Sequence, residues 1–313
     1  MTTHFIELAQ RASGNGRISP QELLDLRKEG WGDGAIHRDE AEALFAINNV
    51  LSERDDAWTD FFVEAISELV LNGSEPRLQC SDSEAAWLIE QIDHDGVVES
   101  LAELETMVRI VERAQNVPER LKNYVLDQVE REVLTGEGPT RFGGELSATH
   151  ISDAEVHILR RVIFASGGFG PAAVSRYDAE MLFRLKDATL AENNAAGWDD
   201  LFIDAVANHL KGYVLKHAQL EHGRRLELEA FIANNEPNVG RFMARMFNSA
   251  PKVANSLGVV FGKRKVAPGF AEQADEGAVV SDHEQAWLES MIGADGKVDD
   301  LERRLIERIA EEA

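Results

Sequence analysis

The chain has 313 residues, 44% of them hydrophobic, and 56 acidic against 32 basic side chains give it a formal net charge of −24. This length allows two domains of ordinary size, and this charge repels nucleic-acid phosphates while attracting cations and basic proteins. One cysteine, no secretory-type N-terminus and no apolar run near the ~18 residues of a spanning helix predict a cytoplasmic protein without disulfides.

Helix signals begin early and follow one another along the first half of the chain. In ISPQELLDLR, residues 18–27, Ser19 and Glu22 have the spacing of a capping box, and Pro20 suits the first helical turn. Apolar residues at three- and four-residue steps then predict further helices. These stripes lie in 40–51, 57–71, 104–114 and 121–134, and a capping box of Ser81 with Glu84 predicts a further helix start. No strand-like alternation appears, so the sequence predicts an all-α fold.

Four segments of the first half return in the second half in the same order. The pairs are 18–27 with 151–160, 35–45 with 173–183, 58–66 with 198–206, and 81–98 with 281–298. We therefore predict two tandem, duplicated helical-bundle modules, 1–138 and 151–313, joined by a Gly-rich linker at 139–150. The second module carries a basic insertion at about 211–280. The paired tryptophans, Trp58 with Trp198 and Trp87 with Trp287, are expected core anchors.

Asp-Gly turns precede several predicted helices, and two interpretations compete for the same carboxylates. In helix capping, an apolar residue two after the glycine comes just before the N-cap, and a Glu six after it is the third helical residue; Glu22, Glu40 and Glu302 fit this spacing. In an EF-hand loop, oxygen ligands are needed at positions 1, 3, 5 and 12. The turns at Gly96 and Gly296 each lack two of these four, so both are degenerate EF-hand-like turns.

The segments WLIEQIDHDGVVESLAELE and IGADGKVDDLERRLIERI resemble the TerB-like domains, helical modules associated with tellurite resistance. The resemblance implies that each half is a TerB-like bundle, linked to stress response, and that acidic residues of the turns bind Ca²⁺ or Mg²⁺ weakly. The implied ligands are Asp93, Asp95, Glu99, Asp295, Asp299 and Glu302. The first turn has Ala102 where the helix-start Glu is expected, and the second has Gly293 in place of the leading Asp.

The basic insertion contains a segment, 238–265, that we call the basic arm. It has Phe and Met residues near helical spacing, no acidic residue and six basic residues, Arg241, Arg245, Lys252, Lys263, Arg264 and Lys265. This pattern is typical of a segment that contacts an anionic membrane surface or a protein partner. Alternatively, the arm folds back on the acidic body or mediates self-association. Peripheral contact with the inner membrane face is thus one expectation among these.

No phosphate-binding loop, nucleophile elbow or metal-protease motif is present in the sequence. We expect a non-enzymatic protein, either a weak divalent-cation-linked stress-response module or a metal-independent protein–protein adaptor that docks through its acidic bodies and basic arm. A hydrolase whose site is assembled from scattered residues is the remaining alternative.

Overall fold

The structure, a computed structural model, describes residues 11, 16–30, 32, 34–93, 96–141, 149–165, 174–218, 286–292 and 298–312. These residues contain helices and no β-strand, with one isolated bridge between Gln79 and Asn116. The predicted all-α class is therefore confirmed for the described chain. The basic arm and most of the basic insertion lie outside these residues.

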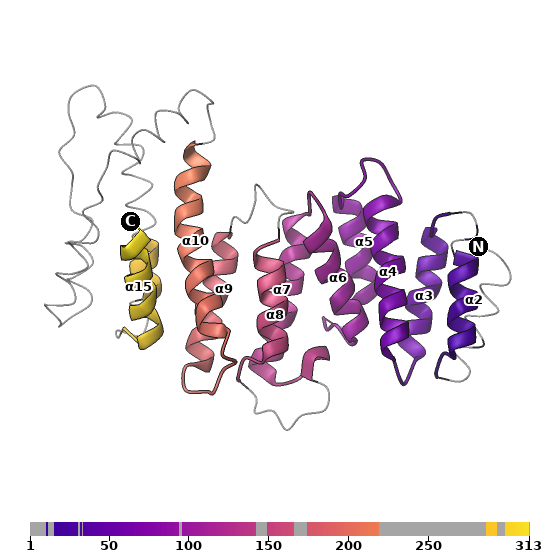
Figure 1. The fold of residues 1–313 in the computed structure, drawn as a ribbon, viewed down its shortest axis with the longest axis horizontal. Helices are drawn as coiled ribbons and strands as arrows, with labels where there is room; N and C mark the ends of the chain where they lie inside the picture. Colours follow the sequence, from indigo (N-terminus) through magenta and orange to yellow (C-terminus); the bar gives the residue numbers. More distant parts are fainter. Residues whose placement is uncertain are drawn as a thin grey trace, which may run out of the picture. The chain divides into compact units, whose positions relative to one another are not determined.

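The helices follow the predicted order (Figure 1). They are α2 (Pro20–Gly30), α3 (Arg38–Val50), α4 (Asp56–Asn72), α5 (Asp82–Ile92), α6 (Leu101–Arg113), α7 (Glu119–Thr135), the 3₁₀ helix η1 (Pro139–Arg141), α8 (Asp153–Ile163), α9 (Arg176–Thr189), α10 (Trp198–Ala218) and α15 (Asp300–Glu312). No helix among the described residues is both long and apolar enough to cross a membrane.

The helix starts follow the capping pattern that the sequence predicts. Ser81 donates its backbone N–H to Glu84 at 2.8 Å, and Ser152 donates to Glu155 at 2.7 Å. In return each serine hydroxyl accepts the amide of its glutamate. Such a cap contributes about 0.5–2 kcal/mol, because the first amides of a helix have no partner within it. The predicted box at Ser281 lies outside the described residues.

Two compact units make up the chain. Unit 1 comprises Met1–Ala173 and Leu185–Ala195, and unit 2 comprises Val174–Arg184 and Ala196–Ala313, so α9 contributes to both. Within unit 1, α4 packs against α2, α3 and α6, and α8 packs against α6 and α7 (Figure 1). Within unit 2, α10 packs against α15. A module boundary at 139–150 stays a prediction about which segments fold alone.

The core of unit 1 is centred on Phe45. Its ring meets the Phe62 ring edge-on at 5.0 Å and the Trp87 ring at 6.0 Å. The Arg38 guanidinium lies 4.8 Å above the Trp87 ring, and the Trp87 indole N–H donates to Glu42 at 3.3 Å. Edge-to-face aromatic pairs of this kind contribute about 0.5–1.5 kcal/mol beyond their buried area.

Unit 2 contains a cluster with the same contacts. Phe183 meets Phe202 edge-on at 5.0 Å and Trp287 at 6.1 Å. Arg176 lies 5.9 Å above the Trp287 ring, whose indole N–H donates to Glu180 at 3.1 Å. All four tryptophans predicted as core anchors are buried in the structure.

A fully buried asparagine, Asn48 of α3, joins four parts of unit 1. Its amide nitrogen donates to Glu103 at 2.8 Å and to Ser100 at 3.1 Å, both at the start of α6. Its amide oxygen accepts from the Trp58 indole and from Arg54, each at 3.1 Å. One side chain thus meets the hydrogen-bonding needs of α3, α4, α6 and the connection before α4.

Asn48→Ala should lower the free energy of unfolding by about 2–4 kcal/mol, because several buried polar groups would lose their partner. Asn49→Ala, on the exposed next position of α3, serves as the control and should change it by less than about 1 kcal/mol. Urea unfolding followed by tryptophan fluorescence measures both. Equal effects of the two variants would contradict the importance assigned to Asn48.

Candidate functional site

The first Asp-Gly turn connects α5 to α6, and its described residues are held by protein groups. Asp93 is the C-cap of α5, and its carboxylate accepts the backbone N–H of Gly96 at 2.5 Å. Gly96 has a φ of +87°, a conformation that glycine adopts without steric cost. The turn therefore uses the Asp93 carboxylate to bind its own backbone.

Gln128, a buried residue of α7, closes this turn from outside. Its side-chain oxygen accepts the N–H of Val98 at 3.1 Å, and its side-chain nitrogen donates to the carbonyl of Gly96 at 3.2 Å. The two bonds fix the chain on the α6 side of the glycine. In an EF-hand loop the bound ion organises the corresponding backbone, whereas here an amide from another helix does so.

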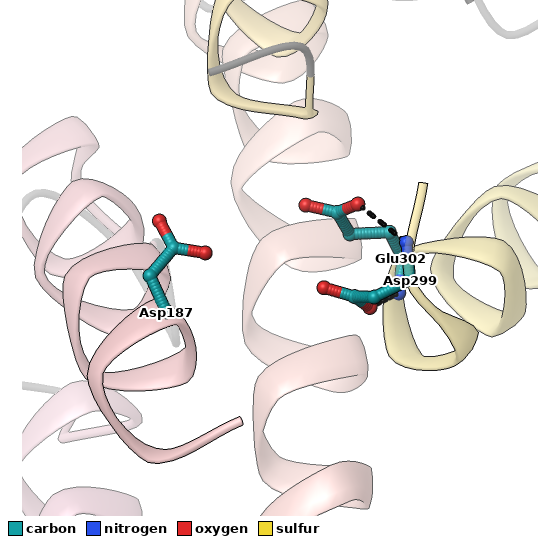
Figure 2. Close-up of side chains that lie close together, drawn as sticks. All are labelled: Asp187, Asp299 and Glu302. Carbon is teal, nitrogen blue, oxygen red and sulfur yellow. Dashed lines mark hydrogen bonds between the residues drawn. The ribbon is translucent and has the colours of Figure 1, made fainter. Parts of the chain in front are cut away.

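The second turn leads into α15, where Asp299 and Glu302 form a reciprocal cap. The Asp299 N–H donates to Glu302 at 3.0 Å, and the Glu302 N–H donates to Asp299 at 2.8 Å (Figure 2). Glu302 is buried. Figure 2 also draws Asp187, which lies on the part of α9 that belongs to unit 1. The capping interpretation of Glu302 is therefore confirmed.

The structure brings together only some of the predicted cation ligands that it describes. Asp299 and Glu302 meet as a cap, while Asp93 accepts a backbone amide and Glu99 is exposed between Val98 and Ser100. Asp95 and Asp295 lie outside the described residues. The predicted ligands whose contacts are known thus use carboxylate oxygens to satisfy backbone N–H groups.

The spacing from the glycine of the first turn predicts Glu99 as the N-cap of α6, which is one residue too early. Ser100 is the N-cap of α6 and Glu103 is its third residue, in a complete capping box. Ser100 and Glu103 therefore hold the places that Asp299 and Glu302 hold in unit 2, and Glu99 is an additional residue. The Ser-x-x-Glu spacing was visible in the sequence and could have identified this start.

Glu103 is the buried carboxyl group closest to the first turn in sequence. Burial raises its pKa, whereas hydrogen bonds from Ser100 and Asn48 and the nearby charge of Arg54 act in the opposite direction. Both of its oxygens have partners, Asn48 on one and the Ser100 N–H on the other. Through these hydrogen bonds, Glu103 holds the start of α6 on α3.

Cys80 and an open hollow in unit 2 are two further features of the described residues. Burial raises the pKa of Cys80 to about 12, with Glu84 and Asp82 adding to the effect, so this thiol does not form a thiolate near neutral pH. An open hollow of about 240 Å³ in unit 2 lies between α10 and α15. Arg304, on its wall, pairs with Asp199 at 2.5 Å, as is typical of a surface ion pair.

No family model, curated protein or solved structure matches this chain.

Gln128→Ala should loosen the first turn without unfolding α6, because Val98 loses its acceptor while the capping box at Ser100 remains. Loss of about 1.4 kcal/mol of local stability corresponds to tenfold faster hydrogen exchange. We expect this at the Val98 amide and not at the Leu104 amide, which is bonded to the Ser100 carbonyl. Exchange measured by NMR tests the assignment, and unchanged protection of Val98 would contradict it.

Proposed function

We propose that the chain is a non-enzymatic, metal-independent helical adaptor that docks positively charged protein segments on its acidic surface. The proposal rests on what the carboxylates of the Asp-Gly turns bind in the structure. Asp93, Asp299 and Glu302 bind backbone N–H groups, and a carboxylate oxygen that caps a helix is less available to a cation.

The distribution of charge supports the same proposal. Exposed carboxylates occur on every helix from α3 to α7, and examples are Glu42, Asp60, Glu68, Glu90, Glu112 and Asp127. Ion pairs at such positions are individually weak, about 0–1 kcal/mol each, so a partner would bind through many of them. The field of many like charges also accelerates the encounter with a basic partner.

The chain itself contains a positively charged segment of the kind that would bind this acidic surface. The basic arm, 238–265, has six basic and no acidic residues, while the chain as a whole carries −24. We infer that the arm of one molecule docks on the acidic body of another, so that the adaptor self-associates. The matching aromatic clusters of the two units support the duplication, and the proposal keeps the TerB-like identity as an inference from the resemblance of the two turn segments.

The competing function is a weak divalent-cation module, and titration distinguishes the two. Isothermal titration with Ca²⁺ and Mg²⁺ should give dissociation constants of ~10⁻⁴ M or weaker, because each turn lacks several ligands of a sensor loop. Asp93→Asn and Asp299→Asn should leave the heats unchanged, since diffuse screening does not depend on one carboxylate. Tight binding that either variant abolishes would favour the cation module.

Analytical ultracentrifugation of the full chain tests the adaptor. We expect concentration-dependent self-association at low salt that is lost at about 1 M salt, where the Debye length falls to about 3 Å. Replacing the six basic residues of the arm by glutamine should abolish it at low salt, and replacing three exposed lysines or arginines elsewhere, Arg27, Lys28 and Arg120, should not. A chain that stays monomeric under all these conditions would contradict docking through the arm.

A further inference from the structure

Buried charged side chains gather in unit 1 where α7, η1 and α8 meet. Glu132 belongs to α7, Arg141 to η1 and Glu155 to α8, and all three are more than nine-tenths buried. Ionised groups are rarely buried to this extent without partners, because removing them from water is costly. The hydrogen bonds and ion pairs that each of the three side chains makes therefore determine how firmly the helices are joined.

Arg141 and Glu155 satisfy each other. The Arg141 Nε donates to one Glu155 oxygen at 2.8 Å, and Nη2 donates to the other at 2.9 Å. The same guanidinium donates to the carbonyl of His150 at 2.5 Å, and the Ser152 N–H completes the shell of Glu155. One buried positive charge is thereby matched to one buried negative charge.

Glu132 lacks an equivalent match. Its Oε2 accepts the backbone N–H of Thr140 at 3.1 Å and also the Thr140 hydroxyl. Its Oε1 is buried and has no hydrogen-bond partner among the described residues. The side chain is also packed closely on the turn after α7, because a Cβ on Gly138 would lie 2.0 Å from the Glu132 Cγ.

Among the charged groups on the neighbouring elements, two act on Glu132. Glu155 of α8 disfavours its ionised form, Arg141 of η1 favours it, and His150 lies beside Arg141, with ring Nδ1 and Nη1 3.4 Å apart. On α6, Glu105 and Glu112 are paired to Arg161, and Arg109 lies between them in sequence. The charged residues of α5, Asp82, Glu84 and Glu90, are exposed or partly exposed at that helix's surface.

We propose that Glu132 is a proton-dependent latch that, in its neutral form, holds η1 and the start of α8 on α7. With Glu132 neutral, the cluster contains one carboxylate and one guanidinium. With Glu132 ionised, it contains a second buried negative charge whose Oε1 has no donor among the described residues. Deprotonation therefore loosens the Thr140 contact and, with it, η1.

The direction of the pH dependence follows from the site. Burial raises the pKa of Glu132 above the ordinary 4.5, and the nearby Glu155 adds to the effect, although the Thr140 bonds oppose it. The closed latch then binds a proton more tightly than the open one. Its stability is greatest below pH 4.5, falls as the pH rises through the raised pKa, and is constant above it.

Two NMR measurements on the full chain test the latch. The carboxyl carbon of Glu132 should titrate above pH 4.5, the ordinary value for a glutamate. Between pH 4.5 and the Glu132 midpoint, hydrogen-exchange protection of the Thr140 amide should fall about tenfold for each unit by which the pKa is raised. Protection is taken relative to intrinsic exchange, which removes its own pH dependence.

Two variants distinguish the protonation of Glu132 from the titration of the chain's other carboxyl groups. Glu132→Gln, which stays neutral, should make Thr140 protection independent of pH, while the control Glu137→Gln should retain the wild-type fall. A Glu132 midpoint at or below pH 4.5 in the wild type would overturn the proposal even if Glu132→Gln fails to fold. The same fall in Thr140 protection in Glu132→Gln as in the wild type would also overturn it.

Discussion

A helix must find acceptors for its first backbone N–H groups, and in this chain side-chain carboxylates supply them. Glu84, Glu103 and Glu155 each accept the N–H of the serine that caps their helix, and Glu302 does the same for Asp299. These are the oxygens that a cation loop before a helix would also require. Where a predicted cation turn precedes such a helix, as at Glu302, the cap and a metal ion would compete for the same oxygens, and in the structure the cap holds them.

Three buried glutamates of unit 1 show how burial assigns different roles to one residue type. Glu103 is bonded on both oxygens by Asn48 and the Ser100 backbone, and Glu155 is matched by the guanidinium of Arg141. Glu132 has donors on one oxygen only among the described residues. The hydrogen bonds of Glu103 and Glu155 hold helices together. An unmatched buried charge is unstable, so Glu132 responds to protonation instead.

The two units share the geometry of their aromatic clusters, although the segments that follow these clusters differ in length. Phe45 with Phe62 and Phe183 with Phe202 have equal ring separations, and an arginine lies over the tryptophan in each unit. Core packing of this kind depends on shape and tolerates little change.

The all-α class, the helix starts at Ser19, Ser81 and Ser152, and the burial of the tryptophans could all be predicted from the sequence. A cap depends on groups three residues apart, and an apolar stripe depends on the helical period, so both are readable from local sequence. The side chain that closes the first turn and the hydrogen-bond partners of Asn48 became evident only in the folded chain. Gln128 binds Val98 across 30 residues and Asn48 binds Glu103 across 55. Such partners are selected by how helices pack, because a buried polar group accepts whichever complementary group the fold brings within reach.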